Sequence, residues 1–322
     1  NIASFIHSGS FANSFGAFLP LQSGDKGVRS VEDIQFLSPN GGLGAIVLVK
    51  PIYTTRIREL ASPSESNCFK DSALLLAGTP IANTWSGTAL NAQVPSETTG
   101  FGLYHGGNVS TDVKNLLNMG AVSAVATAVP STLMLVDMCL YYPGISMNSA
   151  TAQTLVNTNT LTRYTTGAGL RAALVIQTTA GATAHNIAIS YTNQAGTAGR
   201  TLPVTVAGTA SAIAPHITHS GTAANNYGPF LPLASGDTGI RSVQTLTLSA
   251  ASLAGTAALC LYKPLMEIPI TTASVYAERD LLNQLPSLPV IQDGACLTWL
   301  LFTGGALAAT SNIFGKVTSV WG

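Results

Sequence analysis

One segment of this chain occurs twice. Residues 7–31 read HSGSFANSFGAFLPLQSGDKGVRSV and residues 219–243 read HSGTAANNYGPFLPLASGDTGIRSV, so 17 of the 25 positions are identical without a gap. After a slip of one residue, AIVLVKP (45–51) aligns with AALCLYKP (257–264). A repeat at a fixed offset indicates that one structural unit is used more than once, and any fold for the chain must accommodate it.

The offset of about 212 residues predicts three parts of similar length, each of an ordinary domain size. Residues 1–110 form the first copy of a duplicated β domain, residues 111–212 a central β domain, and residues 213–322 the second copy. Two arrangements of the central part are open: it folds independently, or it completes the sheets of the two copies. If the repeat is structural, residues 7–31 and 219–243 should superpose.

Apolar and polar residues alternate in several short segments, as they do in half-buried strands. In NIAISYT, Ile187, Ile189 and Tyr191 share one face, and LPVTV (202–206) repeats the pattern. The apolar run Leu297–Phe302 fits a strand that is covered on both faces. Turn-forming residues cluster between such segments, at SPNGG (38–42), YYPG (141–144) and NQAGTAG (193–199). The pattern predicts a mainly β fold, with tandem domains of the β-sandwich or jelly-roll type.

Helices are expected to be few and short. The strongest candidate is Ser274–Leu285, where Val275, Leu281 and Leu282 can share one helical face. A second candidate covers residues 111–121, with a capping hydroxyl at its start. Neither is long enough to organise the fold, so we expect the sheets to do so.

Charged residues make up only 9% of the chain, against about 25% in ordinary soluble domains, and the net charge is zero. Binding to nucleic acid requires a concentrated basic face, which 14 Lys and Arg spread along the chain do not supply. A net charge near zero also removes the repulsion that keeps protein copies apart. We therefore expect no nucleic-acid partner, and association with further copies of the chain.

Four cysteines, Cys68, Cys139, Cys260 and Cys296, are widely separated and have no metal-binding spacing. We expect them to be buried free thiols in a chain that folds in a reducing compartment. The most membrane-like window, Asn118–Val136, carries no charge but is too weakly apolar to predict a membrane span. A buried helix followed by a strand fits this window better.

The most prominent polar motif is SGDxGhRS, where h is an apolar residue, and it occurs once in each copy. It places Asp25 four residues before Arg29, and Asp237 four residues before Arg241. The flanking glycines permit a tight turn, and each Asp can pair with its Arg. We interpret the motif as a structural turn closed by these two ion pairs, because a catalytic acid requires a partner and none is repeated with it.

No other motif points to chemistry. The sequence lacks a GxSxG elbow and an HExxH helix, so it predicts no catalytic residue, no metal ligand and no cofactor-binding residue. A sugar-binding surface built on Trp85, Trp299 and Trp321 is conceivable, but these residues fit the core better.

Two stretches resemble virion structural proteins of tailed bacteriophages: RYTTGAGLRAALVIQTTAGATAHNIAISYTNQAGTAGR (163–200) and AERDLLNQLPSLPVIQDGACLTWLLFTGG (277–305). The segment GPFLPLASGDTGIRSVQ (228–244) resembles the same group. This resemblance implies a particle component made in the bacterial cytoplasm and incorporated into the virion. Its partners would be copies of itself and other virion proteins, with no cofactor, nucleic acid or membrane.

We therefore expect a non-enzymatic, self-associating protein that decorates or stabilises a capsid. A neck, collar or tail component is the nearest alternative within the same class. A receptor- or carbohydrate-binding β module is an alternative of a different class. An enzyme would need a site assembled between domains from residues that carry no local motif.

Overall fold

The described part of the chain consists almost entirely of β-strands. A computed structural model describes residues 54–61, 68–71, 85–95, 102, 103, 105, 107–123, 126, 129–212, 214–218, 229–285, 287–303 and 312–321. Its strands belong mostly to antiparallel sheets, and α1 (Leu281–Gln284) is a single helical turn. The predicted mainly β class is confirmed.

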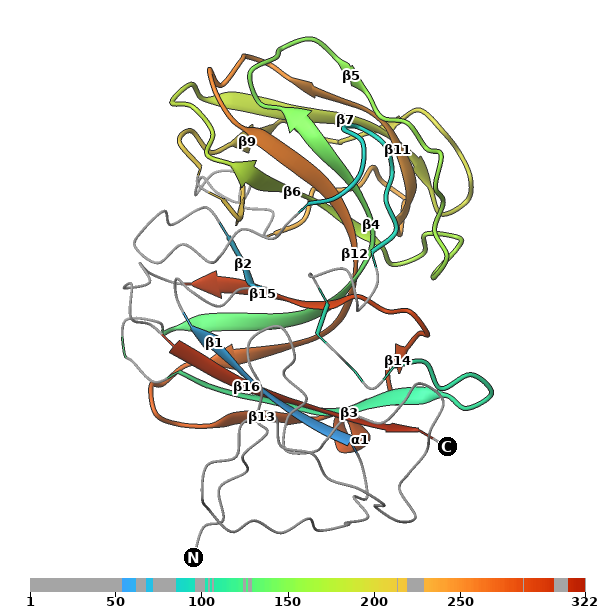
Figure 1. The fold of residues 1–322 in the computed structure, drawn as a ribbon, viewed down its shortest axis with the longest axis vertical. Coiled ribbons are helices and arrows are strands. Elements are labelled where there is room, and N and C mark those ends of the chain that lie inside the picture. Colours follow the sequence, from blue (N-terminus) through green and yellow to red (C-terminus); the bar gives the residue numbers. More distant parts are fainter. Residues whose placement is uncertain are drawn as a thin grey trace, which may run out of the picture.

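Two five-stranded sheets lie at opposite ends of the molecule (Figure 1). The lower sheet in that view contains β1 (Thr54–Ala61), β16 (Asn312–Trp321), β3 (Lys114–Ser123) and β13 (Ala277–Asp280), in this order, with β14 (Val290–Ile291) also paired to β3. The upper sheet contains β5 (Gln153–Thr154), β11 (Ile240–Leu248), β7 (His185–Asn193) and β8 (Arg200–Thr201), in this order, with β9 (Val206–Gly208) also paired to β7.

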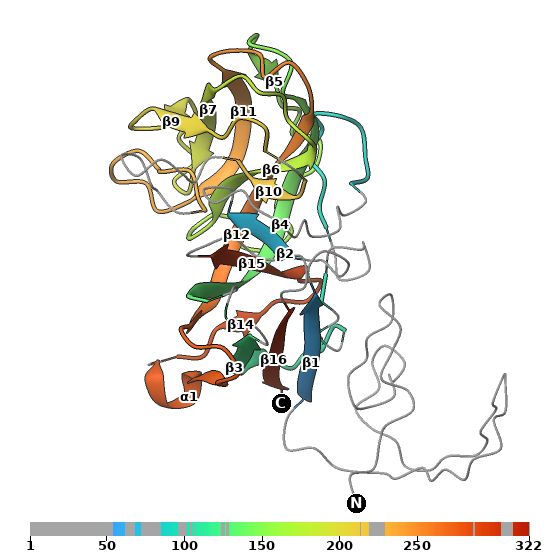
Figure 2. The same ribbon diagram turned by 90° about the vertical axis from the view of Figure 1, so that its left-hand side faces the viewer.

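A closed ring of six strands connects these two sheets. Around the ring, the order is β10 (His216–Ile217), β2 (Cys68–Asp71), β15 (Leu297–Thr303), β4 (Ser131–Ser146), β12 (Thr256–Ile270) and β6 (Arg171–Thr178). The strands β4 and β12 pair antiparallel along their length and extend from the lower half into the upper half (Figures 1 and 2). Both halves are therefore built on the same two strands.

Three apolar clusters fill the space between these layers. The upper cluster lies between the upper sheet and the adjoining parts of β4, β6 and β12, and includes Tyr142 and Tyr191. The lower cluster lies between the lower sheet and the other ends of β4 and β12, with Trp299 of β15 as its largest side chain. The third cluster includes Met138, Cys260 and other residues of the ring strands. Because successive strand residues point to opposite faces, β4 and β12 contribute to all three clusters.

The sequence predicted several strands correctly. Within β7, Ile187, Ile189 and Tyr191 are buried, whereas Asn186 and Ala188 are exposed, as the alternation requires. The run Leu297–Phe302 lies in β15 and is largely buried. The turn at 193–199 also forms, with the amide of Asn193 donating to the carbonyl of Thr197 at 3.0 Å.

Two of the other predictions based on local patterns were wrong. The segment 202–206 is not one strand, because only its last residue belongs to β9, and Val204 is 42% exposed. The predicted turn at 141–144 lies within β4, which pairs with β12 on both sides of Pro143 and Gly144. At 141–144, pairing with the distant strand β12 determines the local backbone more than the local residue types do.

Neither predicted helix forms as expected. Most of residues 111–121 belong to β3, where Leu116, Met119 and Ala121 face the lower cluster. Only one turn of the predicted helix at 274–285 is helical, because Ala277–Asp280 pairs with β3 instead. The side chains of Val275 and Leu282 are 57% and 63% exposed, so the predicted apolar face is not a buried face.

Strands from both sides of the predicted boundary at residue 212 share sheets. β4 pairs with β12 and β15, and β7 pairs with β11. Residues 111–212 thus share sheets with residues 213–322. The predicted superposition of residues 7–31 on residues 219–243 involves segments outside the described residues.

The pairings in the two halves correspond to one another. The lower order β13-β3-β16-β1 matches the upper order β5-β11-β7-β8, and β15 lies beside β4 as β6 lies beside β12. Thr111, shortly before β3, and Gly236, shortly before β11, both have a φ of 83°. The strand orders and pairings of the two halves therefore correspond, at an offset different from that of the sequence repeat.

Candidate functional site

The second copy of the SGDxGhRS motif forms a tight turn before β11. The amide of Asp237 donates to the carbonyl of Ala234 at 3.0 Å, and Gly236 has a φ of 83°. This left-handed conformation favours glycine. The predicted turn is therefore present, and it presents the carboxylate of Asp237 to the neighbouring β7–β8 hairpin.

The carboxylate of Asp237 is held by three side chains of that hairpin. Arg200 Nε donates to Asp237 Oδ2 at 2.9 Å, Tyr191 Oη donates to the same oxygen at 2.7 Å, and Asn193 Nδ2 donates to Oδ1 at 2.7 Å. These donors stabilise the ionised form, so they lower the pKa of Asp237 to about 2, with Arg200 making the largest contribution.

The predicted pair between Asp237 and Arg241 is wrong. Arg241 is the second residue of β11, and its side chain is exposed. Because Ile240 points into the core, the next residue points to the opposite face of the strand. The ion pair forms instead with Arg200, across the sheet. The predicted pair between Asp25 and Arg29 lies outside the described residues.

Main-chain contacts fasten the same turn to the hairpin. Gln194 Oε1 accepts hydrogen bonds from the amides of Thr238 and Gly239, at 3.0 and 3.2 Å. Arg200 Nη2 donates to the carbonyl of Ser235 at 3.1 Å. The motif thus joins the start of β11 to the end of β7. We call Asp237, together with Tyr191, Asn193, Gln194 and Arg200 of the hairpin, the Asp237 clamp.

One sequence signal could have identified Arg200. The sequence predicts a turn at NQAGTAG (193–199), and a hairpin at this turn brings the residue after it opposite the strand that contains Tyr191. In the structure, Arg200 is directly paired with Tyr191. The spacing within the motif favoured Arg241, whereas the hairpin register favours Arg200.

Replacing Arg200 with Met is expected to raise the pKa of Asp237 from about 2 toward about 3.9, the ordinary value for aspartate. Since the folded pKa lies below the unfolded one, the stability from this group is present above about pH 3.9 and is lost as the pH falls toward 2. The pKa can be followed by NMR of carboxyl-labelled Asp. Arg241→Met is the matched control and should leave the pKa of Asp237 unchanged. Equal pKa shifts in the two variants would instead support the ion pair between Asp237 and Arg241.

Replacing Gly239 with Ala is expected to destabilise the protein by about 1–3 kcal/mol, because an added methyl group overpacks the site. A Cβ atom there would lie 2.0 Å from the carbonyl oxygen of Gly167 and 2.7 Å from the amide nitrogen of Gly169. Both atoms belong to the main chain, so neither can rotate away. Urea unfolding measures the loss, with Thr238→Ala at the adjacent exposed position as the control. Similar midpoints for both variants would contradict the predicted contact.

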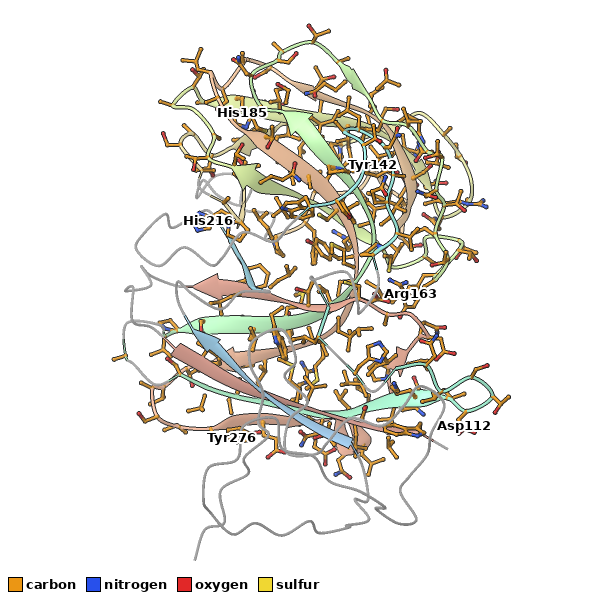
Figure 3. All side chains as sticks on the ribbon, in the orientation of Figure 1. Asp112, Tyr142, Arg163, His185, His216 and Tyr276 are labelled. Atoms are coloured by element: carbon orange, nitrogen blue, oxygen red, sulfur yellow. The ribbon has the colours of Figure 1, made fainter. Side chains whose placement is uncertain are left out.

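A second polar network lies between the two halves, where Figure 3 labels Arg163. Arg163 Nε donates to Asp137 Oδ2 at 2.9 Å, and Arg163 Nη2 donates to Oδ1 at 2.9 Å. The exposed fractions of the two side chains are 5% and 1%. The amide of Cys296 also donates to Asp137 Oδ1, at 2.9 Å, and Arg163 donates to the carbonyl of Met138. The pair therefore links β4, the segment before β6 and the segment before β15.

Three of the cysteines are buried, as the sequence predicted: Cys139, Cys260 and Cys296. Burial raises the pKa of Cys139 and raises that of Cys260 to about 12. A thiol must ionise to act as a nucleophile or a metal ligand. These two groups therefore serve the packing of the core. The side chain of Cys68 is outside the described residues.

The three tryptophans are buried or half-buried. Trp299 is 1% exposed within the lower cluster. Trp85 and Trp321 are half-buried, and Nζ of the buried Lys114 lies 5.3 Å from the ring of Trp321. Within the described ranges, His, Cys, Asp and Glu form no group of three or more that could hold a metal ion.

In both networks the polar groups are used within the protein: the Asp237 clamp fixes a turn, and the Asp137–Arg163 pair joins three segments. Among the residues that the structure describes, no helix is long and apolar enough to cross a membrane. Comparison of the chain with protein-family models, with curated proteins and with solved structures gives no match.

Proposed function

We propose that this chain is a non-enzymatic structural protein of a tailed-phage virion, which self-associates and decorates or stabilises the capsid. The observation that carries the structural role is the use made of the duplicated motif. In its second copy, three donors of the same chain occupy the carboxylate of Asp237. In the copy that the structure describes, the motif is then a device for fixing strands, and a reaction centre would require a carboxylate available to a substrate.

The low charge supports the same proposal. With 14 acidic and 14 basic residues in 322, copies of the chain do not repel one another strongly. The kind of assembly is suggested by the resemblance of residues 163–200 and 277–305 to virion structural proteins. We further propose that the fold is a tandem of jelly-roll-like units, supported by the facing β layers and the matching strand orders of the two halves.

Two measurements test this function. Size-exclusion chromatography with light scattering should show that the purified chain self-associates. Virus particles of the phage whose genome encodes this chain can be purified on a density gradient. Mass spectrometry of these particles should then detect the chain, at a copy number similar to that of the shell proteins. A strictly monomeric chain that is absent from the particles would remove the proposal.

A neck, collar or tail component is the nearest variant of the proposal, and the same copy number separates it from a decorating protein. A ring of a neck or collar contains few copies, whereas a decorated shell contains many. The buried and half-buried positions of the three tryptophans give no support to a carbohydrate-binding role.

A further inference from the structure

We propose that β1 and β2 are exchanged between neighbouring copies of the chain, so that each copy completes the sheets of another. This inference rests on the self-association proposed above and names the surface that carries it. We call the two strands together the β1–β2 arm. In the structure, the arm completes the chain's own lower sheet and ring; in the assembly, the same pairings form with a second copy.

The first argument is how the arm is attached. Each of the eight residues of β1 is paired with a residue of β16, from Thr54 opposite Ser319 to Ala61 opposite Asn312. Within the described part of the chain, β16 is the one strand that pairs with β1. The strand β2 fills the space between β15 and β10, and is parallel to both. Such ladders consist of main-chain hydrogen bonds, which an identical strand from another chain can form equally well.

The second argument comes from the correspondence between the halves. In the upper half, the place beside β7 is taken by β8 and β9, which follow β7 in the chain after the turn at 193–199. The matching place beside β16 in the lower half is taken by β1 (Figure 2). Residues 62–311 separate β1 from β16 in sequence. The position that a contiguous hairpin fills in one half is thus filled in the other by a strand with no short connection to its neighbour.

The third argument is reach. Thirteen residues, 72–84, connect β2 to Trp85. Fully extended, they span up to roughly 43 Å, at about 3.3 Å per residue. A connection of this length can carry the arm to the β16 edge of a second copy that lies within that distance. Exchange of an identical element is a low-cost route to oligomers, because the exchanged contacts are already those of the folded chain.

A pair of cysteine variants tests the exchange. Ile57 is directly opposite Lys316 in the β1–β16 ladder. Ile57→Cys and Lys316→Cys, introduced into separate full-length chains with different affinity tags, are co-expressed, purified through both tags and oxidised. Exchange predicts a disulfide-linked heterodimer on a non-reducing gel. The matched control pairs Ile57→Cys with Val204→Cys, a 42%-exposed position in the upper half, and should give no such band.

The double variant in a single chain separates the remaining outcomes. Cross-linked oligomers support the exchange, whereas an intramolecular disulfide in a monomer, with no heterodimer from the mixed chains, overturns it. The absence of any disulfide in both experiments also counts against the exchange, because the exchanged ladder would place the two cysteines opposite one another. Light scattering on the unmodified chain distinguishes the two proposals: self-association without the heterodimer leaves the structural role in place and removes only the exchange.

Discussion

Replacing Arg163 with Met is expected to lower the free energy of unfolding by about 3–5 kcal/mol, the usual cost of leaving one charge of a buried ion pair without its partner. Arg163 makes two hydrogen bonds to Asp137, and both side chains are almost fully buried. Met fills a similar volume but donates no hydrogen bond. The shift in the midpoint of urea unfolding, at an unchanged slope, measures the loss.

Two further variants identify the cause of that loss. Arg241→Met makes the same substitution at an exposed position, and is expected to change stability by less than about 0.5 kcal/mol. Adding Asp137→Asn to Arg163→Met removes the stranded charge while keeping an oxygen for the amide of Cys296. The double variant should therefore be more stable than Arg163→Met alone. If it is equally unstable, the loss comes from packing and the electrostatic explanation fails.

Replacing Trp299 with Ala is expected to destabilise the protein by about 3–5 kcal/mol, because the substitution leaves a large cavity in the lower cluster. Trp299 is 1% exposed and pairs with Leu135 of β4 and Cys68 of β2. Thermal or urea unfolding gives the magnitude.

Trp299→Phe is the informative control, because the indole nitrogen of Trp299 is buried without a hydrogen-bond partner. Phe keeps most of the apolar surface and removes a polar group whose burial is costly. The expected loss is well below that of Trp299→Ala, because Phe leaves a smaller cavity. A loss as large as that of Trp299→Ala would show that the nitrogen makes an essential contact.

The sequence predicted strands best where one short segment carried the full pattern. The alternation in β7 required one buried face, and Ile187, Ile189 and Tyr191 provide it. The helices were predicted wrongly because pairing partners lie far away in sequence. Residues 114–123 can form either a helix or a strand locally, and β16, about 200 residues later, supplies the ladder that decides.

The candidate site shows the same limit. The positions of the turn and of Asp237 were predictable from two glycines around an acidic residue. The partner of Asp237 was not predictable, because Arg241, four residues away, was the only cationic residue within that copy of the motif. The alternation of β11 directs Arg241 into solvent, while the hairpin register brings Arg200 to the carboxylate. The partnership of Asp137 with Arg163 carried no local pattern, since 26 residues separate them.

The two strands shared by both halves determine how the molecule bears a mechanical load. A tension applied between the ends of antiparallel strands such as β4 and β12 acts along the ladder, so that its many hydrogen bonds resist together rather than opening one by one. The Asp137–Arg163 pair lies beside this ladder, between the upper and the lower half of the molecule. Within the part of the chain that the structure describes, one continuous ladder therefore joins the two halves, and a pull on one half is transmitted to the other along it.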